Sequence, residues 1–507
     1  MLFLHSSVSV STRSAAIGNR DRLNAKVFGV SPAGGFSCIN ARKSKMGLTL
    51  ATVTRAAYSP IPTTETPVIA ESVPQWTSLQ KLGFRLLFTV GGGMLAVTGG
   101  VVLLVTVFGS VVGFDEGHYP CERLLWILAQ IGSYLTRGRS VEITRSAGGD
   151  MLWMWCFQLG WIAVALPITA LWTVMDRRRP NYRSLAASLL VFARFGLALV
   201  MIFYGWGKVI PVQMGYMPLP EHQLQLTGDT SLFNTLWGFV GASEAYSVSI
   251  GLIELLSGLL LLWNRTWVLG ALGSVISTAQ VFLLNMTYDV PVKLVAAQLF
   301  LVAIAITCPF WPNLVRVVFN RGGTRPVELW SPLWADKRWL RRAGVIAKFG
   351  IAAMLLTITG VGGVMAYIGY HTPSSTLDGV WRATSFTIDG REATLNQATP
   401  QPWVNVAITD RNKVRQLGVV RFVSQEPAGY TTRWLLNIDG DRLELRKPES
   451  DSTQVVLRAT QPDKDRLVLT GELDGKQIEG TYERRFMERS RSHFRLVSPP
   501  IPMDSVR

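Results

Sequence analysis

The chain has 507 residues, of which 48% are hydrophobic and 17% are charged, and its mean hydropathy is +0.25. This apolar excess indicates a membrane protein and excludes an ordinary water-soluble composition. The net charge of +16 would suit a nucleic-acid-binding protein, but much of the basic charge flanks apolar segments and no nucleic-acid motif accompanies it, so we expect no nucleic-acid partner.

The N-terminal region lacks the pattern of a folded domain. Residues 1–60 are rich in Ser and Arg and contain one acidic residue, Asp21. This composition resembles a transit peptide, and the alternative is an over-extended reading frame whose true start is Met46. We expect residues 1–76 to be a disordered segment and linker.

Seven apolar segments are long enough to cross a bilayer, which takes about 20 residues in a helix. They predict a polytopic α-helical membrane bundle of about seven transmembrane helices over residues 77–370. The segment 121–135 is amphipathic, too short to span and flanked by charge, so we expect it to lie on the outer face of the membrane. The seven segments run near 82–110, 151–175, 185–207, 244–263, 266–285, 290–310 and 343–370.

Basic residues in the short loops indicate the orientation of the bundle. Four arginines lie in 176–183, Arg265 follows the fourth span, and seven Lys and Arg residues lie in 316–342. All three loops fall on one side of a seven-span topology. By the positive-inside rule, the N-terminus is expected in the cytoplasm and the C-terminal domain outside it.

From residue 377 onward, the sequence alternates apolar and polar residues with frequent turn signals. Three Asp-Gly pairs, at 389–390, 439–440 and 474–475, indicate tight hairpins. Eight or nine short strands predict an antiparallel β-barrel in residues 371–507. Its opening Gly379-x-Trp381 resembles the Gly-x-Trp of lipocalins, so a lipocalin-like barrel is expected, either filled or holding a ligand. The candidate strands are 379–388, 403–409, 413–424, 430–438, 441–447, 453–459, 465–473, 476–484 and 493–498.

Charged residues within the apolar spans predict two interhelical ion pairs. Arg194 and Lys208 lie in the third span, and Glu244 and Glu254 lie in the fourth, which runs the opposite way. Matching their depths pairs Arg194 with Glu254 at mid-membrane and Lys208 with Glu244 near the outer surface. Such pairs either only specify helix packing or belong to a functional site.

The outer half of the bundle collects polar residues that could form a ligand site. Asp289 precedes Pro291 and is alternatively the N-cap of the next helix. The functional interpretation is a polar site open to a lipid headgroup, a quinone or a small anion. The candidate ligand-binding residues are Tyr204, Lys208, Glu244, Asn285, Asp289 and Lys293.

Cysteine and histidine patterns give no evidence of a cofactor site. The four cysteines lack CxxC spacing, so neither a zinc site nor a thioredoxin-type site is expected. The five histidines lie outside the apolar cores, whereas a haem held between membrane helices needs histidines inside them. We expect no metal, and quinone is the one cofactor left open.

Several motifs within residues 185–315 resemble those of the DoxX-like membrane proteins, whose founding member is the small subunit of a thiosulfate:quinone oxidoreductase. The resemblance implies a compact helical bundle and brings no catalytic residues. The chain as a whole is longer than the compact family form, with added spans and a terminal barrel. In this it looks like a bacterial form of that family, which implies the plasma (inner) membrane. The motifs are Tyr204-Gly-Trp-Gly-Lys208, Gly251-Leu-Ile-Glu254 and Asn285-Met-Thr-Tyr-Asp-Val-Pro-Val-Lys293.

The resemblance implies an accessory or ligand-binding membrane component linked to quinone or redox-stress complexes. Its expected partners are the lipid bilayer and membrane oxidoreductase subunits. Two alternatives stay open. One is a transporter of lipids or small solutes that uses the Arg194–Glu254 layer. The other is an enzyme that acts on a lipophilic substrate at the outer membrane boundary.

Overall fold

The computed structural model describes most of the chain from Gln75 onward. The expected N-terminal segment up to residue 74, the second part of the first span and the candidate strand 493–498 lie outside the described residues. The described residues are 75–96, 122–136, 138, 140–144, 149–393, 400–411, 418–424, 431–448 and 453–487.

Six helices among the described residues are long and apolar enough to cross a membrane, which confirms the helical bundle. The first predicted span begins as α1 (Ser78–Leu86) and continues into the π-helix η1 (Leu87–Gly92). The six helices are α5 (Leu152–Met175), α6 (Arg183–Val209), α9 (Glu244–Leu262), α10 (Trp267–Thr287), α11 with its continuation η4 and α12 (Lys293–Val318), and α13 (Arg338–His371).

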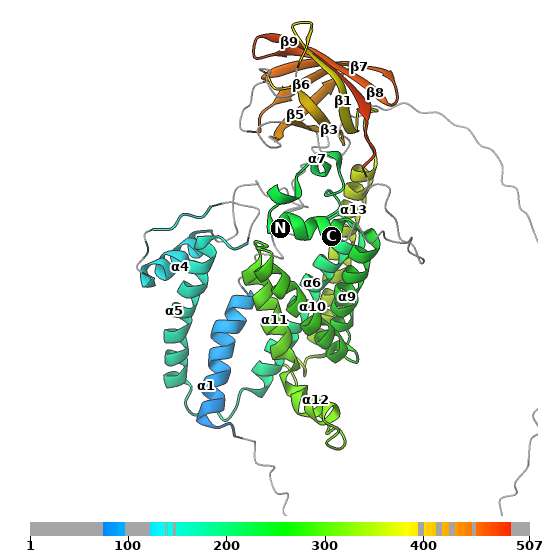
Figure 1. The fold of residues 1–507 in the computed structure, drawn as a ribbon. Coiled ribbons are helices and arrows are strands. Elements are labelled where there is room, and N and C mark those ends of the chain that lie inside the picture. The colour runs from blue at the N-terminus through cyan, green and yellow to red at the C-terminus, as the bar shows by residue number, and fades with distance from the viewer. Residues whose placement is uncertain are drawn as a thin grey trace, which may run out of the picture. The chain divides into compact units, whose positions relative to one another are not determined.

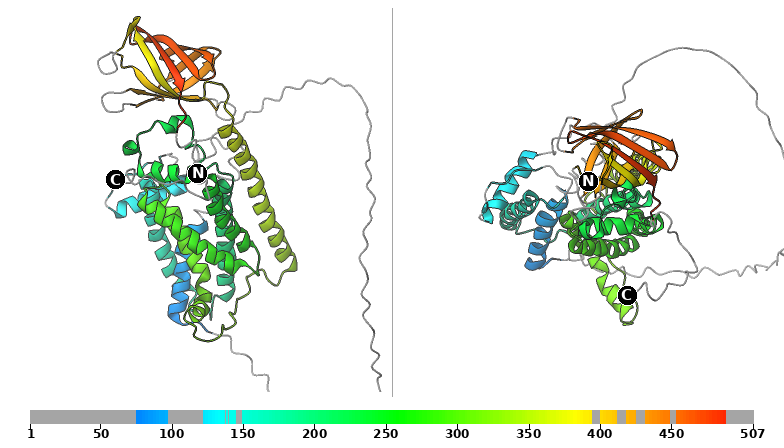
Figure 2. Two further views of the ribbon diagram at one scale, coloured as in Figure 1. Left: turned by 45° about the vertical axis from the view of Figure 1, so that its right-hand side comes forward. Right: turned by 45° about the horizontal axis from the view of Figure 1, so that its top comes forward.

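Helix α6 lies at the centre of the main group of helices and packs against α9, α11 and α13, while α10 packs against α9 and α11 (Figure 1). Fully buried Leu197 and Ile202 of α6 meet Leu255 and Leu261 of α9 in one apolar core. In Figure 2, α13 is one unbroken helix along its whole length. The outward side chains of these helices are largely apolar, as a lipid environment requires.

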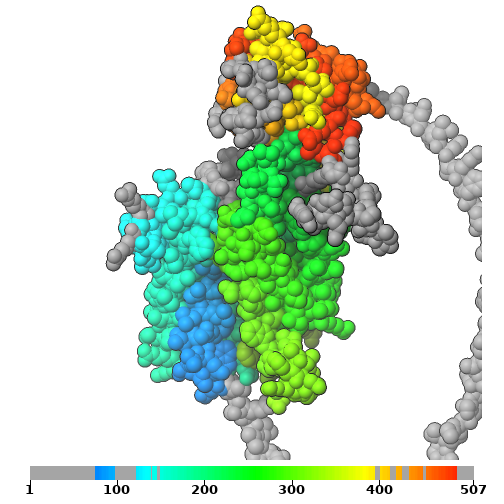
Figure 3. Space-filling view, viewed as in Figure 1, coloured from blue at the N-terminus to red at the C-terminus, as the bar shows by residue number. Residues whose placement is uncertain are grey.

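A second group of helices contains α1, α4 (Glu122–Leu135) and α5. The amphipathic segment expected at 121–135 is α4, which packs closely on α5 because Gly132 and Gly160 let the two backbones touch. Helix α1 lies directly against α5 (Figure 3). The buried Arg85 of α1 donates to Tyr182 Oη at 2.7 and 3.0 Å, which ties α1 to the start of α6.

The C-terminal part is a closed, lipocalin-like, up-and-down antiparallel barrel of eight strands, as predicted (Figure 1). Each strand pairs with its neighbour in the sequence, pairing between β1 and β9 closes the barrel, and the short β2 (Arg391–Glu392) adds a hairpin to β1. The eight strands are β1 (Gly379–Ile388), β3 (Trp403–Thr409), β4 (Gly418–Ser424), β5 (Thr431–Asp439), β6 (Arg442–Arg446), β7 (Val455–Asp463), β8 (Arg466–Leu473) and β9 (Lys476–Arg484).

The Asp-Gly pairs form tight turns of two kinds. Asp474 and Gly475 both have positive φ, 53° and 75°, and form the two-residue β8–β9 turn. In the β5–β6 turn, Gly440 occupies the first central position with φ 61°. Glycine is favoured there because most L side chains are strained at that φ, which Asp and Asn tolerate better than other residues. The β8–β9 turn therefore lies at the predicted residues 474–475, whereas the β5–β6 turn lies at 440–441, one residue after the predicted pair.

One end of the barrel is closed by Trp381, which has no exposed surface. Its Nε1 donates to Leu377 O at 2.8 Å, and the guanidinium of Arg484 lies 4.2 Å from its ring centroid. Apolar side chains from all eight strands fill the space above it. The interior is therefore a packed core rather than a deep ligand chamber, and any cavity must lie at the other end.

The segment between α6 and α9 contacts the barrel. It contains α7 (Pro220–Gln223), η3 (Thr227–Asp229) and α8 (Leu232–Gly241). The Glu221 amide donates to Thr409 Oγ1 at 2.9 Å, and its carboxylate pairs with Arg433 at 3.1 Å.

Candidate functional site

The polar residues predicted to form one outer site belong to three separate clusters. The α6–α9 cluster contains Tyr204, Lys208 and Glu254. The α10–α11 cluster contains Asn285, Asp289 and Lys293 together with Asp150. The α9–α13 cluster contains Glu244, Tyr367 and His371.

In the α6–α9 cluster, the predicted ion pairs are wrong in their partners. Lys208 Nζ lies 2.6 Å from Glu254 Oε2, and both side chains are more than nine-tenths buried. Lys208 also lies 5.6 Å from the ring centroid of Tyr204. Glu244 therefore does not pair with Lys208, and Glu254 does not pair with Arg194.

The α6–α9 crossing explains the different pairing. Gly205 lies in backbone contact with Gly251, and Gly258 contacts the backbone of α6 about two turns before Gly205. These close approaches fix the relative depth of the two helices. The same register places Lys208 within reach of Glu254. Matching depths from the span boundaries had instead paired Lys208 with Glu244, which lies about three helical turns away from Glu254 on α9.

Arg194 lies level with the turn between α9 and α10 rather than at mid-membrane. Its Nη2 donates to Asn264 Oδ1 at 2.7 Å, and its guanidinium lies 5.5 Å from the ring centroid of Trp267. The turn at 263–266 ends the apolar run of α9. Arg194 is therefore at the boundary of the hydrocarbon, where a charge costs less than at its centre.

In the α10–α11 cluster, the helix cap is not Asp289 but Asp150, from the segment before α5. The Asp150 carboxylate accepts the N–H groups of Lys293 and Leu294 at 2.6 and 3.0 Å, which satisfies two donors at the start of α11. Asp289 has φ 52° and pairs with Lys293 at 2.7 Å. Asn285 is buried and donates to the backbone of the same turn.

Replacing Asp150 with Ala is expected to lower the free energy of unfolding by about 1–2 kcal/mol, because two partly buried N–H groups at the start of α11 lose their acceptor. Thermal unfolding in detergent would measure this. Asp289→Asn is the matched control, since its side chain is 80% exposed, asparagine tolerates the positive φ, and the change should alter stability by less than about 0.5 kcal/mol. Equal effects of the two substitutions would contradict the assignment of the cap.

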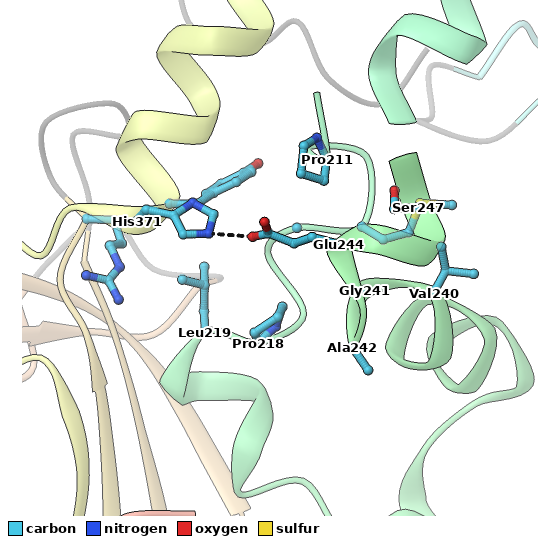
Figure 4. A pocket seen from close by; sticks show the side chains of 13 residues that line it. Pro211, Pro218, Leu219, Val240, Gly241, Ala242, Glu244, Ser247 and His371 are labelled. Carbon is cyan, nitrogen blue, oxygen red and sulfur yellow. Dashed lines mark hydrogen bonds and ion pairs between the residues drawn. The ribbon is translucent and has the colours of Figure 1, made fainter. Parts of the chain in front are cut away.

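The α9–α13 cluster opens into a cavity of about 300 Å³. Figure 4 shows Glu244 and His371 facing each other across it, and His371 Nε2 lies 2.9 Å from Glu244 Oε1. Arg411 of the barrel also lines the cavity and pairs with Asp378 at 3.0 Å. Burial raises the pKa of Asp378, although the Asp410 N–H and the Arg411 guanidinium act in the opposite direction. An acid, an imidazole and a guanidinium together could hold a small polar solute.

A second cavity, of about 750 Å³, lies at the barrel end opposite Trp381, and we call it the mouth. It is lined by Trp403 and Trp434 together with polar side chains that include Lys447 and Glu472. Trp403 stacks on Phe422 with ring centroids 3.9 Å apart. Lys447 Nζ lies 5.6 Å from the ring centroid of Trp434.

Sequence reasoning missed His371, Asp150 and the residues of the mouth as site residues. The signal for the mouth was present, because Trp403, Ser424 and Val455 begin or end strands at one barrel end. The signal for Asp150 was an acid just before an apolar helix. Neither signal indicates which residues the side chains contact, because those residues lie far away in the sequence.

Among the described residues, no group of three or more His, Cys, Asp or Glu side chains could hold a metal ion. Comparisons with protein-family models, with curated proteins and with solved structures found no match.

Proposed function

We propose that the protein is a membrane-anchored ligand-binding component of the DoxX-like type, in which the barrel mouth binds the ring of a small amphiphile. The observation that supports this is the mouth cavity, whose volume of about 750 Å³ falls within the range of small-molecule pockets. Two tryptophans in one cavity offer apolar faces to a planar ring.

The chemistry of the mouth favours a ring with hydrogen-bond acceptors. Lys447, Gln401 and Gln454 supply donors beside Trp434. A quinone ring carries two carbonyl acceptors on a flat apolar body and matches this set. A long acyl chain does not, because packed side chains fill the barrel below the mouth.

In this proposal, the bundle anchors the barrel on the extracytoplasmic side of a bacterial plasma membrane, as the basic loops indicate. The mouth lies at the barrel end opposite Trp381, which follows α13 closely in the chain, so the barrel would present the quinone ring away from the bilayer. Its recipient would be an extracytoplasmic part of a membrane oxidoreductase. The role is accessory: the protein binds the ligand, and a partner carries out the electron transfer.

The test is equilibrium binding of decylubiquinone to the full chain in nanodiscs. Trp434→Ala and Lys447→Gln are each expected to weaken binding about ten-fold, since buried aromatic and charged contacts contribute most to affinity. Arg458→Gln is the control, because its side chain is 72% exposed and pairs with Asp441 in the β5–β6 turn. Unchanged unfolding temperatures would show that the variants fold.

Two results would contradict the proposal. The first is equal affinity of decylubiquinone for the wild type, Trp434→Ala and Lys447→Gln. The second is displacement of decylubiquinone from the mouth by oleate at equal concentration, because oleate has no ring and the filled barrel offers no channel for its chain.

A further inference from the structure

Two cationic side chains converge on the turn between α9 and α10. Arg194 of α6 donates to Asn264 Oδ1 at 2.7 Å, and Lys348 of α13 donates to Leu262 O. Their acceptors are two residues apart, so one turn holds both cations, and the two charges repel each other. Arg194 is 9% exposed, which makes it one of the most buried cations of the described bundle.

Neither cation is neutralised within the described part of the chain. Both hydrogen bonds go to neutral amide oxygens, and no carboxylate of the described residues forms an ion pair with Arg194 or Lys348. This contrasts with Lys208, which meets Glu254 directly. Buried charges in membrane proteins are normally paired, so this site lacks an anion.

The surroundings of the two cations are those of a membrane interface. Trp263 is half-exposed and packs edge-on against Phe349, with ring centroids 5.1 Å apart. Trp267 lies beneath Arg194, and Lys348 lies 4.7 Å from the Phe349 ring centroid. Tryptophan at this density is typical of the level of lipid headgroups.

Further basic residues extend along α13 from this turn. Arg338, Arg341 and Lys348 fall within about 80° of one helix face at 100° per residue, and both arginines are exposed. The basic residues of α13 thus run from solvent, at Arg338 and Arg341, to the buried pair of Arg194 and Lys348. This arrangement suits a phospholipid whose phosphate lies at the buried pair and whose glycerol points toward the hydrocarbon. Basic pockets between helices bind anionic lipids in this way.

We propose that Arg194 and Lys348 hold the phosphate of an anionic phospholipid at the α9–α10 turn. The guanidinium offers a planar pair of donors to two phosphate oxygens, and the lysine ammonium adds a point charge. The acyl chains would lie along the apolar outer faces of α9 and α13. This site is separate from the barrel mouth and does not depend on the function proposed for it.

The test titrates the full chain in detergent with dioleoylphosphatidylglycerol and counts retained lipid by native mass spectrometry. Lys348→Gln and Arg194→Gln are each expected to weaken retention about ten-fold, the loss typical of one charged hydrogen bond. The single variants Lys348→Arg and Arg194→Lys keep the positive charge and should retain most of the lipid that the wild type retains. Arg265→Gln is the control, because it removes one positive charge from the same turn at an exposed position.

Three results would overturn the proposal. One is equal retention by the wild type and by Lys348→Gln, the variant least disruptive to folding because Lys348 is half-buried. Another is that the wild type retains the zwitterionic dioleoylphosphatidylcholine as well as it retains dioleoylphosphatidylglycerol. The third is full competition by inorganic phosphate at millimolar concentration, which would mean that the site recognises a free anion rather than a lipid.

Discussion

Glu254→Gln is expected to lower the free energy of unfolding of the helical bundle by about 3–5 kcal/mol, the range measured when one partner of a buried ion pair is removed. The reason is the lysine that remains. Lys208 is 7% exposed and its ammonium lies 2.6 Å from the carboxylate, so Gln would leave a full charge without a counter-charge. Lys208→Met should cost a similar amount, since it leaves the carboxylate unpaired.

The double substitution distinguishes the loss of the Lys208–Glu254 interaction from a nonspecific loss of stability caused by either substitution. Lys208→Met combined with Glu254→Leu is expected to recover most of the loss, because two apolar side chains of similar volume can replace a buried pair at little cost. Unfolding in detergent with increasing denaturant would measure all three variants. If the two single losses simply add in the double variant, the two groups are not coupled and the pairing is wrong.

A second double variant tests the pairing expected from the sequence. Arg194 and Glu254 are not partners, so the effects of Arg194→Gln and Glu254→Gln should add within about 0.5 kcal/mol. Strong coupling between them would support the Arg194–Glu254 ion pair that the sequence predicts. The contrast between the two cycles therefore identifies the partner of Glu254.

Local signals predicted the elements well. The apolar runs gave α5 and α6 within about two residues of their ends, because hydrocarbon requires an unbroken helix and water ends it. Alternation and Asp-Gly pairs gave β1 and β9 at their observed bounds. Each of these signals lies within the element that it predicts.

The site was predicted less well because its pairings depend on how the elements pack. Asp150 caps a helix that begins 143 residues later, and Glu244 meets a histidine 127 residues away. The partner of Glu254 depends on the depth at which α6 and α9 cross. That depth is set by close backbone contacts at Gly205, Gly251 and Gly258, whereas the apolar pattern is nearly the same at every register.

Because of these glycine contacts, alanine substitutions at two glycines two residues apart, Gly205 and Gly207, are expected to change stability in opposite directions. A Cβ on Gly205 would lie 2.8 Å from Leu255 Cα and 2.9 Å from Gly251 O, whereas a Cβ on Gly207 would meet nothing within 4 Å. Backbone atoms cannot rotate away, so Gly205→Ala must push α6 and α9 apart. We expect it to cost about 1–3 kcal/mol or more.

Gly207→Ala provides the matched control within the same helical turn. Alanine there should raise stability by about 0.5–1 kcal/mol, because it restricts the unfolded chain and fits the helix without a clash. Thermal unfolding in detergent compares the two directly. Because separated helices can no longer hold Lys208 against its carboxylate, Gly205→Ala combined with Glu254→Gln should cost less than the sum of the two. Effects of equal sign at positions 205 and 207, or a strictly additive double variant, would show that Gly205 does not set the helix crossing.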